Sequence, residues 1–296
     1  MTAGEKGFLL LTGYLGDPER KPLTVAQFRE LTARARATSH LLEERELTEA
    51  DLLAMGCDRS AARKILLLLE QTEQLTWYVE KGYRLDCRPL TRISDGYPRR
   101  LRRVLGMEAP GTLWCKGDMS LLKNKTVSLV GSRDLGPENQ AFAKEVGRQA
   151  ALQGYTLVSG NARGADRTAQ ESCLENGGSV IAVVADELTN HPVRERLLYL
   201  SEEGYDLPFV GYRALQRNRV IHACSDRVFV AQCTYGKGGT WDGTKNNLRT
   251  DLSQVFCFRD GSRAMEELAQ LGAIGIDIGE LADFSALKGS TICFWE

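Results

Sequence analysis

Two short turns in the sequence carry residue types that bind phosphate groups, and each follows an apolar run rich in β-branched residues. They lie within VSLVGSRD and TLVSGNARGAD. Glycine lets the backbone approach an anion, serine and arginine donate hydrogen bonds, and the amides at the start of a following helix point the same way. The candidate phosphate-binding residues in these turns are Gly131, Ser132, Arg133, Ser159, Gly160, Arg163 and Gly164.

Two later segments add the same chemistry. QRNR precedes an apolar run, VIHAC, and the glycine-rich GKGGT precedes a further helical pattern. Arginines on a helix also suit a solvent-exposed face, and a single glycine turn also suits an ordinary strand–helix connection. The occurrence of all four segments favours one shared anion site, to which the second pair contributes Arg217, Asn218, Arg219, Lys237, Gly238, Gly239 and Thr240.

Asp166, Trp241 and Asp242 could contact a ribose or a base. Asp166 equally suits a helix start, where a carboxylate accepts hydrogen bonds from free amides. Trp241 could stack on a base or fill the core. General acid–base catalysis needs a group with a tuned pKa within reach of the reacting bond. The sequence offers no convincing candidate, so we predict no catalytic residues and a protein that is not an enzyme.

Motifs for cofactors and metals are missing from the sequence. Neither turn has the GxGxxG spacing of dinucleotide enzymes, and no GK[ST] phosphate loop occurs. The eight cysteines form no CxxC pair, and no histidine lies at zinc-ligand spacing. We therefore predict neither a cofactor nor a metal site.

The elements that must position these residues follow a strand–helix alternation over residues 125–282. Apolar β-branched runs such as TVSLV, TLVS, SVIAVV, RVFV and VFCF alternate with helical segments, which indicates a Rossmann-like, doubly wound, mostly parallel sheet. Apolar residues spaced by three and four predict a small all-helical N-terminal domain over residues 1–88. Residues 89–124 are expected to be a connector packed on the following domain, and residues 283–296 a C-terminal tail.

Composition gives few further constraints. The formal net charge of −1 marks no global affinity for nucleic acid or membranes, so any basic patch must be local. No stretch is as long and apolar as a membrane span, and the N-terminus lacks the pattern of a secretory signal. We expect a soluble cytoplasmic protein without membrane contacts.

The ordered series GSR, SG-x-A-x-G-x-D, GGSVIAVVA, SEEG, QRNRVI and a glycine-rich loop opening a helix resembles the DNA-processing protein A family (DprA, also called Smf). The likeness covers residues 93 to about 277. It implies a Rossmann-like domain that binds single-stranded DNA in DNA processing, recombination or natural transformation. It further implies a homo-oligomer, and a RecA-type recombinase or an operon partner as the protein partner.

The sequence departs from the family pattern at several positions. Ala165 stands where isoleucine is usual, Gln170 where histidine is usual, and GKGGTWDGT replaces the family's loop. That loop is similar to the one in LOG-type nucleotide phosphoribohydrolases of the wider superfamily. Our hypothesis is a non-catalytic binder of single-stranded DNA. The alternatives are a nucleotide-binding protein, including a LOG-like phosphoribohydrolase, and an interaction scaffold with a degenerate site.

Overall fold

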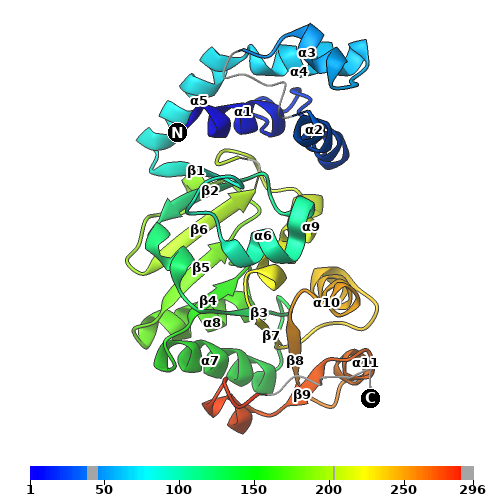
Figure 1. Cartoon of the computed structure of the whole chain (residues 1–296). Helices are drawn as coiled ribbons and strands as arrows, with labels where there is room; N and C mark the ends of the chain where they lie inside the picture. Colours follow the sequence, from blue (N-terminus) through cyan, green and yellow to red (C-terminus); the bar gives the residue numbers. More distant parts are fainter. Residues whose placement is uncertain (39–45, 203, 288–296) are drawn as a thin grey trace.

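A nine-stranded sheet forms the centre of the computed structural model, which describes residues 1–38, 46–202 and 204–287 (Figure 1). The strand order is β1-β2-β6-β5-β4-β3-β7-β8-β9. β1 pairs antiparallel with β2, and β2 antiparallel with β6, whereas all other pairs are parallel. The predicted mostly parallel α/β fold is therefore confirmed. The strands are β1 (Cys87–Thr91), β2 (Thr112–Gly117), β3 (Thr126–Val130), β4 (Thr156–Ser159), β5 (Ser179–Val183), β6 (Leu197–Glu202), β7 (Arg227–Val230), β8 (Gln254–Phe258) and β9 (Ile274–Ile276).

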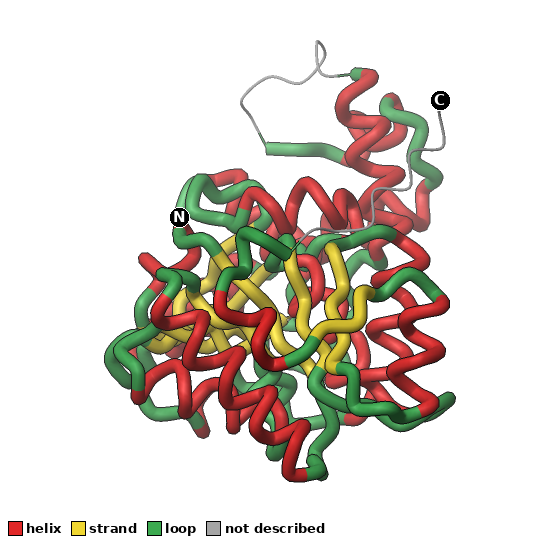
Figure 2. The backbone as a smooth tube through the Cα atoms, turned by 90° about the horizontal axis from the view of Figure 1, so that it is seen from below, coloured by secondary structure: helices red, strands yellow, loops and turns green. Residues whose placement is uncertain are grey.

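Helices cover both faces of this sheet, which is the doubly wound arrangement (Figure 2). Along β3, Val127 and Leu129 belong to one buried cluster, and Val130 belongs to the other. Both faces of the strand are therefore apolar, as parallel strands between two helical layers require. One face carries α7 (Pro137–Leu152) and α8 (Ala165–Glu175); the other carries α6 (Arg99–Leu105), α9 (Gly211–Ala223), α10 (Gly238–Thr250) and α11 (Arg263–Gln270).

The order of the strands reverses at β3. The chain passes from β3 through β4 and β5 to β6 on one side, and then returns to build β7, β8 and β9 on the other. In open α/β sheets such a reversal opens a crevice beyond the carboxyl ends of the strands. The ends of β3 and β7, which are neighbours here, are therefore the expected place for a ligand.

The N-terminal part of the chain is helical. It contains α1 (Ala3–Thr12), α2 (Val25–Ala37), α3 (Glu49–Ala54), α4 (Arg59–Leu69) and α5 (Thr72–Arg84), with capping boxes at Thr2, Thr24 and Thr48. An aromatic cluster joins this unit to the sheet: Tyr78 of α5 stacks on Tyr205 at 4.5 Å and meets Trp114 of β2 edge-on at 5.2 Å. The helical unit thus packs on the β1–β2 end of the sheet.

Residues 89–124 contribute more than a packed connector, because they supply β2 and most of β1 to the central sheet. The strand rhythm of the sequence did not indicate β1, β2, β6 or β9. β6 follows β5 with only a short 3-10 turn, Leu188–Asn190, between them, so the helix that usually separates parallel strands is missing there. Of the predicted tail, residues 288–296 lie outside the described residues.

Among the residues that the structure describes, no helix combines the length and the apolar character needed to cross a membrane.

Close packing of α7 on α8 generates a first prediction. A Cβ atom at Gly147 of α7 would overlap the backbone carbonyl of Ala169 in α8. Gly147→Ala should therefore lower the free energy of unfolding by about 1–3 kcal/mol, as overpacked cores do. Urea denaturation measures the effect. Gly7→Ala in α1 is the control, since no atom lies within 4 Å of the added carbon; equal stability of the two variants would contradict the interpretation.

Candidate phosphate-binding pocket

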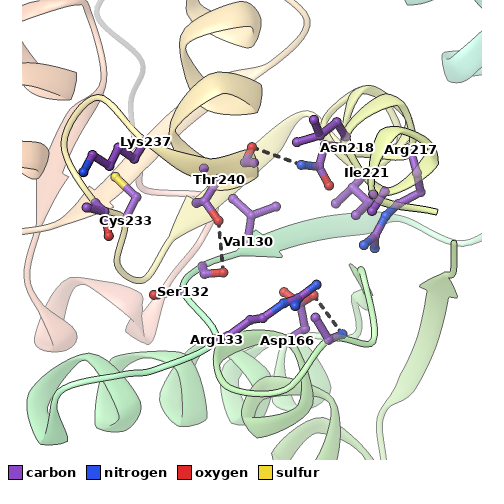
Figure 3. Close-up of a pocket in the computed structure, with 18 of the residues that line it drawn as sticks. Val130, Ser132, Arg133, Asp166, Arg217, Asn218, Ile221, Cys233, Lys237 and Thr240 are labelled. Atoms are coloured by element: carbon purple, nitrogen blue, oxygen red, sulfur yellow. Dashed lines mark hydrogen bonds between the residues drawn. The ribbon is translucent and has the colours of Figure 1, made fainter. Parts of the chain in front are cut away.

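A pocket of about 380 Å³ lies where the strand order reverses, beyond the carboxyl ends of β3 and β7 (Figure 3). Its walls come from the loop after β3, the start of α8, one side of α9 along most of its length, and the loop between β7 and α10 with the start of α10. The structure thus brings together residues from all four predicted segments. Those that line the pocket are Gly131, Ser132, Arg133, Asp166, Arg217, Asn218, Lys237, Gly238, Gly239 and Thr240.

The glycines of the first two turns permit close packing between protein segments. A Cβ atom at Gly131 would collide with the side chain of Ala165, and one at Gly164 would collide with the carbonyl oxygens of Ser132 and Arg133. Gly164 also has φ +85°, a conformation that favours glycine. The amide of Ala165 donates to the Ser132 carbonyl at 3.1 Å, so the two turns pack directly against each other.

In the loop between β7 and α10, Gly238 is open, whereas a Cβ atom at Gly239 would lie 3.0 Å from Asn218 Nδ2 and 3.1 Å from Leu215. Gly238 has φ +87°, and no atom lies within 4 Å of the position that its Cβ would take. No side chain caps the start of α10, and none caps the start of α9. Gly211, Gly238 and Gly239 all line the pocket. Two uncapped helix starts therefore border the cavity, and their amides favour an anion there.

Hydrogen bonds fix these helix starts in place. Asn218 of α9 donates through Nδ2 to the Gly239 carbonyl at 3.0 Å, and Thr240 of α10 donates through Oγ1 to the Gly131 carbonyl at 3.0 Å (Figure 3). α9, α10 and the end of β3 are thereby joined around the pocket. Both side chains act on protein carbonyls in this arrangement, which gives them a positioning role.

Arg217 is buried beneath the pocket and bonds to the protein. Its Nη1 donates to the Val183 carbonyl at 2.7 Å, and only 9% of the residue is exposed. Asp166 lies beside it, buried and accepting a hydrogen bond from the Ala162 amide at 3.2 Å. Gly160 makes room for both, since a Cβ atom there would collide with each of the two side chains. Burial raises the pKa of Asp166 to about 6, although the Arg217 guanidinium acts in the opposite direction.

Arg133 and Lys237 are the exposed cations of the pocket. They come from different loops, one after β3 and one before α10 (Figure 3). Within the described ranges, neither side chain makes a hydrogen bond or an ion pair. Both are therefore available to an anionic ligand.

Two predicted arginines have protein partners and do not line this pocket. Arg219 donates twice to Oε2 of Glu202, at 2.9 and 3.1 Å, on the β6 side of α9. Arg163 lies at the surface and pairs with Asp134 at 2.7 Å. The expected set of phosphate-binding arginines is thus separated in space, and Arg133 is the one exposed in the pocket.

Five other predicted residues also lie away from the pocket lining: the packing glycines Gly160 and Gly164, and Ser159, Trp241 and Asp242. Ser159 is buried and accepts a hydrogen bond from Gln170 at 2.5 Å. Trp241 is 5% exposed and meets Tyr235 edge-on at 5.1 Å, which is the packing of a core side chain. Asp242 is exposed on α10. Asp166 and Asp242 therefore do not form a pair of carboxylates at one site.

His222 lines the pocket from below, and the sequence did not indicate this role. Its Nδ1 accepts a hydrogen bond from Asn247 Nδ2 at 2.8 Å, and Asn247 is oriented by the Ser253 amide, which donates to its Oδ1 at 3.0 Å. The neutral ring therefore carries its proton on Nε2, an atom that is buried without a partner. Burial lowers the pKa of His222 to about 4.

An exposed apolar patch at the pocket mouth was also missed by sequence reasoning. Phe209 and Leu215 line the pocket and are 55% and 54% exposed. They flank the start of α9, where Gly211 begins the helix. The sequence DLPFVGYRAL has no periodic pattern that marks Phe209 or Leu215 as exposed.

No cluster of three or more histidine, cysteine, aspartate or glutamate side chains able to hold a metal ion occurs among residues 1–38, 46–202 and 204–287.

A doubly wound, mostly parallel sheet with a pocket at its strand-order reversal defines a protein of the Rossmann-like class. The family model described as DNA recombination-mediator protein A matches residues 88–258, which is more than half of the chain. The protein belongs to this family.

Curated relatives agree with the assignment. Protein Smf of Escherichia coli is 30% identical over 175 residues, covering 55% of this chain and 45% of that protein. DNA processing protein DprA of Streptococcus pneumoniae is 31% identical over 156 residues, covering 49% and 54%. The chain thus spans about half the length of the curated relatives it matches.

Solved structures show the same fold. DprA from Streptococcus pneumoniae superimposes with a TM-score of 0.75 at 22% identity, over 97% of this chain and 99% of that one. DNA processing protein A from Helicobacter pylori, which was studied for its mode of single-stranded DNA binding, gives a TM-score of 0.57 at 25% identity, over 66% and 94%.

The buried titratable groups of the site predict opposing effects of pH on stability. As the pH falls below about 6.5, the unfolded chain protonates His222, whereas the folded chain does so only near its pKa of about 4. Stability from this group is present above pH 6.5 and is lost on acidification. Asp166 has the opposite effect on stability. Its pKa of about 6 in the folded chain lies above its ordinary value, so the folded chain binds this proton first and stability from this group rises as the pH falls below about 6.

Urea unfolding at about pH 7 and about pH 5 tests this assignment. In His222→Gln the loss of stability on acidification should be smaller than in the wild type by about 2 kcal/mol, from about 1.4 kcal/mol per pH unit below 6.5. In Asp166→Asn the loss should be larger than in the wild type, because the compensating carboxyl is gone. Identical pH dependence in all three proteins would refute both assignments.

Proposed function

We propose that this protein binds single-stranded DNA at the pocket beyond β3 and β7, without strong sequence preference, and serves DNA recombination or transformation. The observation that carries the proposal is the pair Arg133 and Lys237, two exposed cations that make no side-chain hydrogen bond or ion pair among the described residues, on loops that border uncapped helix starts. Phosphate groups are the ligand that such donors suit best.

Membership of the DNA recombination-mediator family supports the proposal, as does the single-stranded DNA binding of the Helicobacter pylori relative. The finer parts of the proposal are a RecA-type recombinase as protein partner and a homo-oligomer as working form. Both rest on the family resemblance.

The pocket chemistry favours binding over catalysis. Asp166 lines the pocket, but it is only 7% exposed, lies beside Arg217 and accepts a hydrogen bond from the Ala162 amide, so its carboxylate is engaged by the protein. Asp242 lies outside the pocket lining, and Nε2 of His222 is sealed from solvent. These placements weigh against the LOG-like phosphoribohydrolase, which would need a carboxylate beside the sugar.

Removal of the two exposed cations tests the proposal. In Arg133→Ala/Lys237→Ala the slope of log K against log salt should become shallower by about 1.4, from about 0.7 per phosphate on a single strand. If the two proteins converge at 1 M salt, this corresponds to roughly 25-fold weaker binding at 0.1 M. Fluorescence anisotropy with a thymidine oligonucleotide measures both quantities.

Lys144→Ala serves as the control for that experiment, because Lys144 is an exposed lysine on α7 away from the pocket. Its slope and affinity should match the wild type. Wild-type binding by the Arg133→Ala/Lys237→Ala variant would remove the basis of the proposal.

Phe209 should supply base contacts at the pocket mouth. A stacked base contributes about 1–3 kcal/mol, so Phe209→Ala should weaken single-stranded DNA binding by about 5- to 150-fold while the salt slope stays unchanged. Tyr83→Ala, which removes an aromatic side chain that is 47% exposed on α5, is the matched control. A changed slope with unchanged affinity would show that Phe209 does not stack on bases.

A further inference from the structure

A second and larger cavity lies at the opposite edge of the sheet. It has a volume of about 720 Å³ and is bordered by Thr126 at the start of β3, Arg227 at the start of β7 and Tyr155 just before β4. The loop before α6 and the end of α9 complete its wall. The proposed DNA-binding pocket lies at the carboxyl ends of the same strands, so the two cavities are separate sites.

Cationic side chains surround this cavity: Arg99, Arg100, Lys123, Lys125 and Arg227. Arg100 pairs with Asp226 and donates to the Leu252 carbonyl at 2.7 Å. In the part of the chain that the structure describes, the other four form no ion pair or hydrogen bond with the protein. Asp95 is the one further carboxylate in the lining, so the rim carries an excess of uncompensated positive charge.

Two of these arginines also carry buried donors without acceptors. Nε of Arg100 and Nε of Arg227 are inaccessible to solvent and make no hydrogen bond with any residue that the structure describes. A buried donor left unpaired costs about 1–3 kcal/mol, and native structures keep few of them. Burial also lowers the pKa of Arg100. An anion bound in the cavity would lower the electrostatic free energy of placing these arginines and lysines close together.

The floor of the cavity is apolar. Ile181 of β5 and Leu200 of β6 form part of it and are buried in the core, and the half-buried ring of Tyr155 contributes to the wall. Thr126 donates to the Cys224 carbonyl at 2.7 Å, which fixes the start of β3 against the end of α9. The volume falls within the range of small-ligand sites, about 300–1,000 Å³. The cavity thus combines an apolar floor with a cationic rim.

We propose that this cavity is a second binding site, which takes a nucleotide with its base on the apolar floor and its phosphates against Lys123, Lys125 and the neighbouring arginines. The chemistry is that of a phosphorylated ligand with a flat, weakly polar body. Such a ligand is either a free nucleotide or the 5′-phosphorylated end of a DNA strand.

Charge reversal on the rim tests the proposal. Lys123 and Lys125 are exposed, so Lys123→Glu/Lys125→Glu leaves the core intact, which a thermal melt verifies. Calorimetry with deoxyadenosine triphosphate should show binding to the wild type that weakens by about tenfold or more in this variant, from the loss of charged hydrogen bonds. Lys144→Glu on α7, an equivalent charge reversal elsewhere, should bind as the wild type does.

Two further measurements distinguish a free nucleotide from a strand end as the ligand, and the second cavity from the first pocket as the site. If a strand end is the ligand, the wild type should bind a 5′-phosphorylated thymidine oligonucleotide more tightly than its 5′-hydroxyl form, and the rim variant should lose this preference. Arg133→Ala/Lys237→Ala should retain either effect, because it alters only the first pocket. The proposal is overturned if the wild type neither binds deoxyadenosine triphosphate nor prefers the 5′-phosphorylated oligonucleotide. It is also overturned if these effects are lost in Arg133→Ala/Lys237→Ala but kept in Lys123→Glu/Lys125→Glu. Both outcomes are independent of whether the first pocket binds single-stranded DNA.

Discussion

The buried guanidinium of Arg217 is the contact on which the geometry of the first pocket depends. It ties α9 to the end of β5 through the Val183 carbonyl and lies against Gly160 and the Asp166 carboxylate. Without it, an uncompensated carboxylate would be left in the core, which is strongly destabilising. The start of α9, which borders the cavity, therefore takes its position from a charge that no ligand needs to touch.

This arrangement divides the charged residues of the site into two groups. Arg217, Asp166 and Arg219 hold the frame together through contacts with protein atoms, whereas Arg133 and Lys237 face solvent. Framing charges lose their hydration on folding and are compensated locally. Exposed charges stay hydrated in the free protein and lose water only when they bind a phosphate group.

Sequence patterns were sufficient for the main features of the fold, and they placed the candidate site at strand ends where the structure has a pocket. Continuous apolar runs such as TVSLV and SVIAVV indicated buried parallel strands, and the glycine turns after them predicted a binding site at the carboxyl ends of these strands. The division between framing and exposed arginines could not be predicted, because Arg133 and Arg217 both lie beside an apolar run and differ in the distant groups that they meet. His222 and Phe209 depend on tertiary contacts in the same way.

The packing of the helical unit on β1 has a consequence for how this protein could associate. β1 ends the described sheet on one side, contacts α1 and α5, and contains Pro89, which has no amide hydrogen to donate. That edge is therefore a poor template for another strand. Extension of the described sheet from one molecule to the next would have to use the β9 edge of both molecules, which gives a closed symmetric pair and not a growing array.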